Sequence, residues 1–133
     1  FELPAGAHSP SGAGGSQIAG LRAGDPKMTT NYYLTQLLDD TATAIPADSI
    51  LSQMVHSDSG VKTILFTFAA GQELSDHTAA KTALLYFIEG QAELTLGPDR
   101  PAAQAGTWVQ MPPHLPHSIK ATSRVVMLLT MID

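Results

Sequence analysis

Histidine is the side chain of this sequence best suited to chemistry, because the chain of 133 residues contains no cysteine. Its histidines are His8, His56, His77, His114 and His117. Neutral imidazole binds transition metals through a ring nitrogen. Without thiolates, any metal must be held by imidazole, water and ligand oxygen. We expect His56, beside a polar turn, to be a plain surface residue.

Several other chemistries are excluded by residue pattern. The glycine-rich run at residues 12–15 does not lie between a strand and a helix, as a phosphate-binding loop does. No serine occupies a nucleophile elbow, and the carboxylates cluster at turns instead of pairing as glycoside hydrolysis requires. The formal charge is −5 and the 7 Lys and Arg residues are scattered singly, so we expect no nucleic-acid partner.

The sequence also predicts no membrane partner. Its longest apolar runs, such as Val125 to Leu129, fall far short of the ~20 residues that a membrane span needs. No charged segment followed by an apolar one opens the chain as a signal peptide would. We therefore expect a soluble, cytoplasmic protein, although the absence of cysteine is itself neutral about the redox compartment.

Residues 1–27 differ in composition from the rest of the chain, because 17 of the 27 are Gly, Ala, Ser or Pro. Such a segment buries too little apolar surface to order itself. It ends just before Met28, so we interpret residues 1–27, including His8, as a flexible extension, a tag or linker. The alternative is a native arm that docks on a neighbouring subunit. Residues 28–133 are predicted to form a single domain.

Short segments rich in β-branched and aromatic residues, separated by Gly, Pro and Asp turns, predict an antiparallel sandwich or barrel. The predicted strands are Ile50–His56, Val61–Phe68, Leu84–Ile88, Ala92–Leu96, Thr107–Met111 and Val125–Ile132. The last is apolar at nearly every position and should be buried on both faces. Residues 31–40 have helical spacing over barely two turns, which predicts one short helix or an extended lead-in.

Two stretches of the chain resemble the two motifs of the cupin superfamily. The first motif runs glycine, five residues, His-x-His, three or four residues, glutamate, six residues and glycine, and its matching positions are Gly71, His77 and Gly90. The second runs glycine, five residues, proline, one residue, glycine, two residues and histidine, matched by Gly106, Pro112 and His117. The resemblance covers roughly residues 50–132 and is closest to small single-domain cupins of the conserved-barrel type. It implies an all-β, antiparallel double-stranded β-helix, the jelly-roll cupin barrel, with little helix.

The departures from the motifs bear most on function. The second histidine of the first motif falls on Ala79 and its metal-binding glutamate on Ala83, and neither alanine can bind a metal. Of the usual three histidines and one glutamate, the resemblance leaves His77 and His117, facing each other at the mouth of the barrel. They would hold a divalent transition metal (zinc, nickel, iron, manganese or copper). Since a catalytic site normally has three protein ligands, His114 is the candidate third ligand, and the alternative is that it is an exposed turn residue. The second glycine of the second motif falls on His114, at a turn where a positive φ is tolerated by Gly or Asn and less readily by His.

Other interpretations of the pocket residues are consistent with the sequence. His77 and His117 would then be what is left of a lost metal site, hydrogen-bonded to each other or to water. Asp76 should point away from His77 on a regular strand and would turn inward only at a bulge. Aromatic and methionine side chains would either line an apolar ligand pocket or, more commonly, form core or interface; they are Phe66, Phe68, Tyr86, Phe87, Trp108, Met111, Met127 and Met131.

Three functions are consistent with this pattern. The first is a homodimeric cupin that binds a small, mostly apolar molecule in its barrel, with a weakly held metal. The second is a metal-dependent enzyme of cupin type, a dioxygenase, isomerase or lyase, in which the alanines leave coordination positions open. The third is a non-catalytic assembly module. The doubly apolar strands Val61–Phe68 and Val125–Ile132 favour a homodimer in each case.

Overall fold

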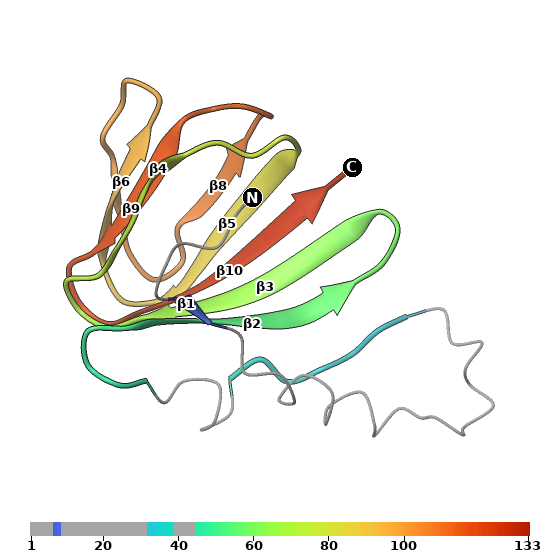
Figure 1. The fold of residues 1–133 in the computed structure, drawn as a ribbon, viewed down its shortest axis with the longest axis horizontal. Coiled ribbons are helices and arrows are strands. Elements are labelled where there is room, and N and C mark those ends of the chain that lie inside the picture. The colour runs from blue at the N-terminus through green and yellow to red at the C-terminus, as the bar shows by residue number, and fades with distance from the viewer. Residues whose placement is uncertain (1–6, 9–31, 39–44) are drawn as a thin grey trace.

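A computed structural model of the chain describes residues 7–8, 32–38 and 45–133, and these form strands and irregular segments with no helix among them. The strands lie in two facing sheets that diverge toward one end (Figure 1). One sheet has six strands, in the order β1 (Ala7–His8), β2 (Ile50–Ser57), β3 (Val61–Phe68), β10 (Val125–Ile132), β5 (Thr82–Glu89) and β8 (Trp108–Met111). The other has four, in the order β4 (Glu73–His77), β9 (His117–Ala121), β6 (Ala92–Leu96) and β7 (Ala102–Ala103).

All strand pairs are antiparallel except β1 with β2, so the all-β jelly-roll fold expected from the sequence is confirmed. The strands predicted from alternation are confirmed to within two residues at each end. The short polar strands β4 and β9 were not among them. Because β1 lies within residues 1–27, two residues of that segment pair with the sheet edge. The remainder of the predicted extension lies outside the described residues.

The core lies between the two sheets, where inward side chains of both faces meet. On β3 every second side chain points inward, and of these Phe66 and Phe68 are fully buried. On β10 and β5 the corresponding positions include Met127, Leu129 and Leu85, also fully buried. At about 25 cal/mol per Å² of buried apolar surface, this layer supplies most of the drive to fold.

Residues 32–38 form an extended lead-in, which was one of the two alternatives expected for residues 31–40. Their burial alternates from residue to residue, as in a strand and unlike a helix. The ring of Tyr33 stacks on His56, with ring centroids 4.2 Å apart, and Leu37 faces Val55 and Leu65 across a small hollow. The segment therefore covers part of the outer face of β2 and β3. No helix in the described residues is long and apolar enough to cross a membrane.

Candidate metal centre

His77 and His117 lie opposite each other on the paired strands β4 and β9. Their ring centroids are 4.2 Å apart and their planes are inclined by 58°. His77 ends β4 and His117 begins β9, and these two strand ends lie at the end of the barrel where the sheets diverge (Figure 1). The structure thus brings together the two histidines that sequence analysis selected.

A β-bulge positions His77. Leu74 and His77 are three residues apart, so a regular strand would direct them to opposite faces. Their partners, Ile119 and His117, are only two residues apart, which means that β4 carries one extra residue between these pairs. The bulge reverses the alternation and turns His77 to the same side as the buried Leu74. Asp76 lies in the bulge but is exposed and does not turn inward.

Hydrogen bonds to the backbone determine the tautomer of both rings. Nδ1 of His77 donates to the carbonyl of Ser75 at 2.6 Å, and Nδ1 of His117 donates to the carbonyl of Leu115 at 2.8 Å. A carbonyl only accepts, so the proton of each neutral ring is on Nδ1 and the lone pair is on Nε2. Both Nε2 atoms are shielded from solvent. Metal-binding histidines commonly have their second nitrogen fixed in this way.

The surroundings of His117 favour its neutral form. Burial of the ring is the largest cause and lowers the pKa of His117 below its usual value. The hydrogen bond to Leu115 and the charge of Asp76 oppose this effect, whereas proximity of His77 adds to it. Because the pKa is lowered on balance, the ring is neutral at pH 7 and its Nε2 is unprotonated, as coordination to a metal requires.

The structure does not gather a third ligand around the pair. Ala79 and Ala83 are buried, at 5% and 1% exposure, and offer no donor side chain. His114 is exposed in the β8–β9 turn, where its φ of 70° matches the left-handed conformation expected of that motif position. Its backbone N–H donates to the carbonyl of Ala79 at 2.7 Å. Across residues 7–8, 32–38 and 45–133, no group of three His, Asp or Glu side chains is close enough to hold a metal ion.

The aromatic side chains divide between core and surface. Phe66, Phe68 and Phe87 are core residues. Tyr86 and Trp108 are paired across β5 and β8, on the outer face of the six-stranded sheet, and are 43% and 58% exposed. They therefore do not line the interior of the barrel. His56 is partly buried under Tyr33 and its Nε2 lies 3.3 Å from Asp58, so it is less exposed than expected.

Sequence reasoning missed two features of this end of the barrel. One is the bulge in β4. The other is a pocket of about 290 Å³ between the β2–β3 turn, the loop after β4 and the end of β10. Neither histidine lines it, and it contains Lys62 and Lys81, which no motif had singled out. The alternation of Val61–Phe68 puts Lys62 on the inward face of that strand, and this was the sequence signal that could have indicated a polar pocket.

Comparison with known proteins supports the fold. A family model described as a cupin domain matches residues 64–133. No curated protein matches the chain. A conserved protein of unknown function from Streptococcus pyogenes is similar with a TM-score of 0.67 and 25% identity, over 77% of this chain and 91% of that one. An RmlC-like cupin from Desulfovibrio desulfuricans has a TM-score of 0.65 and 25% identity, over 76% of this chain and 97% of its own.

A more distant similarity is to an oxalate decarboxylase from Bacillus subtilis. It has a TM-score of 0.53 and 22% identity over 56% of this chain, and the matched part is 21% of the enzyme. Another structure of that enzyme concerns its Mn(II) centres. At this identity the likeness extends to the fold alone.

Proposed function

Because the chain belongs to the cupin superfamily, we propose that its barrel binds a small molecule and that His77 and His117 hold a divalent transition metal beside it. One observation carries the proposal: each Nδ1 donates to a backbone carbonyl, so in the neutral tautomer the lone pair of each ring is on the buried Nε2, the atom that would bind a metal. Two imidazoles fit an ion that takes its other ligands from water or from the bound molecule. The candidates are zinc, nickel, iron, manganese and copper.

His114 is the proposed third ligand. Its ring is exposed and would have to move toward the pair, about a turn whose backbone is tied to Ala79. A site with only two protein ligands should bind its metal weakly, because fewer ligands are fixed in advance. The occupancy of a His114→Ala variant distinguishes the two arrangements: retained metal means a two-histidine site, and lost metal means a three-histidine site.

Elemental analysis of the purified protein tests the metal site. We expect metal bound to the wild type when it is purified with excess metal in the buffer, and its loss in His77→Ala and in His117→Ala. His56→Ala is the matched control, because His56 lies on the other sheet and stacks on Tyr33. Substoichiometric metal that is indifferent to both substitutions would refute the site.

An enzyme is the second candidate function. It is favoured by the alanines at positions 79 and 83, which stand where the family motif has two metal ligands and so would leave coordination positions open for substrate. A metal held there would supply Lewis-acid polarisation of a ligand oxygen. The chain itself would hold neutral imidazoles at fixed orientation through the Ser75 and Leu115 carbonyls.

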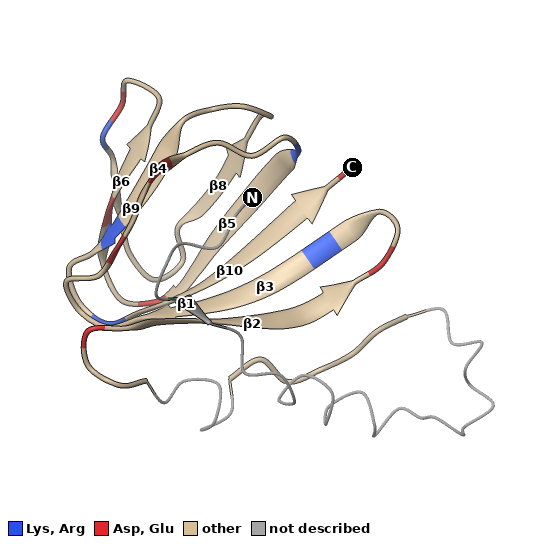
Figure 2. Ribbon diagram, viewed as in Figure 1, with Lys and Arg blue, Asp and Glu red and all other residues tan. Residues whose placement is uncertain are grey.

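We also propose that the protein is a homodimer. Apart from Glu89, which ends β5 and pairs with Arg124, the outward positions of β5, β8 and β10 carry no charged side chain. Trp108 and Tyr86 are exposed there, and Figure 2 shows that charges lie mainly at turns and on the four-stranded sheet. A face with so few charges suits a self-complementary contact with a second copy. The cytoplasmic location expected from the sequence stays a prediction.

A further inference from the structure

The inward-facing row of β3 ends with a cation at the mouth of the barrel. Its inward residues are Ile64, Phe66 and Phe68, and alternation assigns Lys62 to the same face. The register confirms that side, because Lys62 pairs with Met131 of β10, a residue of the core cluster, and both line the same pocket. Lys62 itself is exposed, so this row ends in a solvent-accessible amine at the rim of the pocket.

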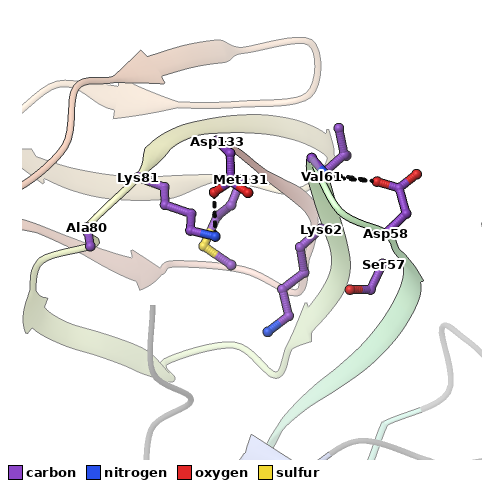
Figure 3. Close-up of a pocket in the computed structure, with 9 residues that line it drawn as sticks. Ser57, Asp58, Val61, Lys62, Ala80, Lys81, Met131 and Asp133 are labelled. Carbon is purple, nitrogen blue, oxygen red and sulfur yellow. Dashed lines mark hydrogen bonds and ion pairs between the residues drawn. The ribbon is translucent and has the colours of Figure 1, made fainter.

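The pocket of about 290 Å³ is at the small end of the range for ligand sites, so it suits a small molecule. Its walls come from three segments that are distant in sequence: residues 57–62, 80–81 and 131–133. Met131 provides an apolar floor, and Figure 3 shows Lys81 reaching across to Asp133 beside it. Met131 also pairs with Ala83, the position at which the family motif has a glutamate.

The carboxylates of the pocket already have partners. Asp133 binds Nζ of Lys81 at 2.5 Å. Asp58 accepts hydrogen bonds from the backbone N–H groups of Gly60 and Val61, at 3.0 and 3.1 Å, and lies beside His56. Lys62 makes no ion pair with any described residue, and in Figure 3 its amine points away from both carboxylates. The formal charges of the lining balance, with two amines and two carboxylates, and Lys62 is the amine that has no ion-pair partner among the described residues, above the apolar side chain of Met131.

We propose that this pocket binds a small organic carboxylate, with Lys62 as the charge partner of the carboxylate and Met131 beneath its apolar part. The proposal names the chemical class of the molecule that the proposed function assigns to the barrel, and in that sense rests on it. Lys81 would add a second amine if the carboxylate displaced Asp133. Ser57 offers a hydroxyl donor at the same rim.

Titration with sodium benzoate, followed by NMR of protein with ¹³C-methyl-labelled methionine, tests the proposal. The Met131 methyl resonance, assigned with a Met131→Leu variant, should shift saturably with a Kd in the millimolar range, because the site is open and a single amine is involved. Benzyl alcohol, the neutral analogue, should leave it unmoved. Binding should weaken as ionic strength rises from about 0.05 to about 0.5 M, since an exposed ion pair is screened.

Substitutions of Lys62 test whether its amine is the group that binds the carboxylate. Lys62→Gln should weaken benzoate binding about tenfold, as expected for a lost hydrogen bond to a charged group, and Lys62→Arg should restore most of it. Lys120→Gln is the matched control, because it removes the same charge from the four-stranded sheet, away from the pocket. Equal affinity in Lys62→Gln and wild type, equal binding of benzyl alcohol, or no saturable shift would overturn the proposal.

Two further arms separate the possible sources of failure. If inorganic phosphate shifts the same methyl more tightly than benzoate, the pocket is an oxyanion site and the carboxylate assignment is wrong. If benzoate binding depends on Lys62 while metal occupancy is indifferent to His77→Ala and His117→Ala, the metal proposal fails and the carboxylate pocket stands. If metal is lost in both histidine variants but benzoate binding is the same in Lys62→Gln and wild type, the metal proposal stands and the carboxylate pocket fails.

Discussion

Gly90 of the first motif is the position at which the backbone should tolerate a side chain least. Its φ is 96°, and a Cβ built on it would lie 1.9 Å from the carbonyl oxygen of Arg124 and 2.9 Å from Cα of Val125. Both are backbone atoms at the start of the central strand β10, and Val125 is fully buried. A rotamer change cannot relieve the overlap, so Gly90→Ala must displace either the β5–β6 turn or β10.

The size of the effect follows from two costs. An L-residue in the left-handed region costs roughly 1–2 kcal/mol, and forced displacement of packed backbone adds about 1–3 kcal/mol. We therefore expect Gly90→Ala to lower the free energy of unfolding by about 2–5 kcal/mol, a large part of the 5–15 kcal/mol typical of a domain. Gly71→Ala is the matched control, because Gly71 has a φ of 87° but no atom lies within 4 Å of the place that a Cβ would take there. The free energy of unfolding of Gly71→Ala should fall by only about 1–2 kcal/mol.

Equilibrium unfolding in urea measures both variants, with the m-value as a check that the unfolding reaction is unchanged. The difference between the two free-energy losses isolates the contact with Arg124 from the strain in φ. If Gly90→Ala is no less stable than Gly71→Ala, the contact has no energetic weight and the explanation of this motif glycine is refuted.

Three further predictions concern the surface, the β2–β3 turn and the metal centre. Trp108→Glu should halve the mass measured by light scattering, because it adds a charge to the proposed dimer face; an unchanged mass would remove that face from the interface. The pKa of Asp58 is lowered chiefly by the Gly60 N–H, then by His56, so its stabilising effect is present at pH 7 and is lost as acid protonates it. Asp58→Asn should thus melt below wild type at pH 7 and approach it below pH of about 4, and a gap independent of pH would contradict this. Ala79→His should raise zinc affinity in calorimetry at least about tenfold by adding a third imidazole, whereas unchanged affinity would mean that position 79 does not face the pair.

Much of the fold was predictable because the long strands carry a strong local signal. β3, β6 and β10 were predicted with their observed bounds, since alternation or continuous apolarity extends over their whole length. By contrast, β4 and β9 have five residues each and are rich in polar side chains, so composition did not identify them as strands. Only the motif resemblance indicated that His77 and His117 belong to facing strands.

The site was predictable as a pair of residues but not as a geometry. The spacing of the motifs selected His77 and His117, and the alanines at positions 79 and 83 already excluded the full ligand set. Alternation alone does not turn His77 inward, because its direction comes from a bulge in β4. A bulge depends on the register between two strands, and no local pattern in one of them encodes it.

The sequence by itself therefore determined the class of fold, the excluded chemistries and the limit on metal ligands, because these depend on which side chains exist and on local periodicity. The tertiary structure decided which ring nitrogen carries the proton, the burial that keeps His117 neutral, and the meeting of Lys62 with Met131 at the barrel mouth. These properties arise from contacts between strands far apart in the chain. Desolvation, hydrogen bonding and charge compensation all act through such contacts, so only the folded chain determines them.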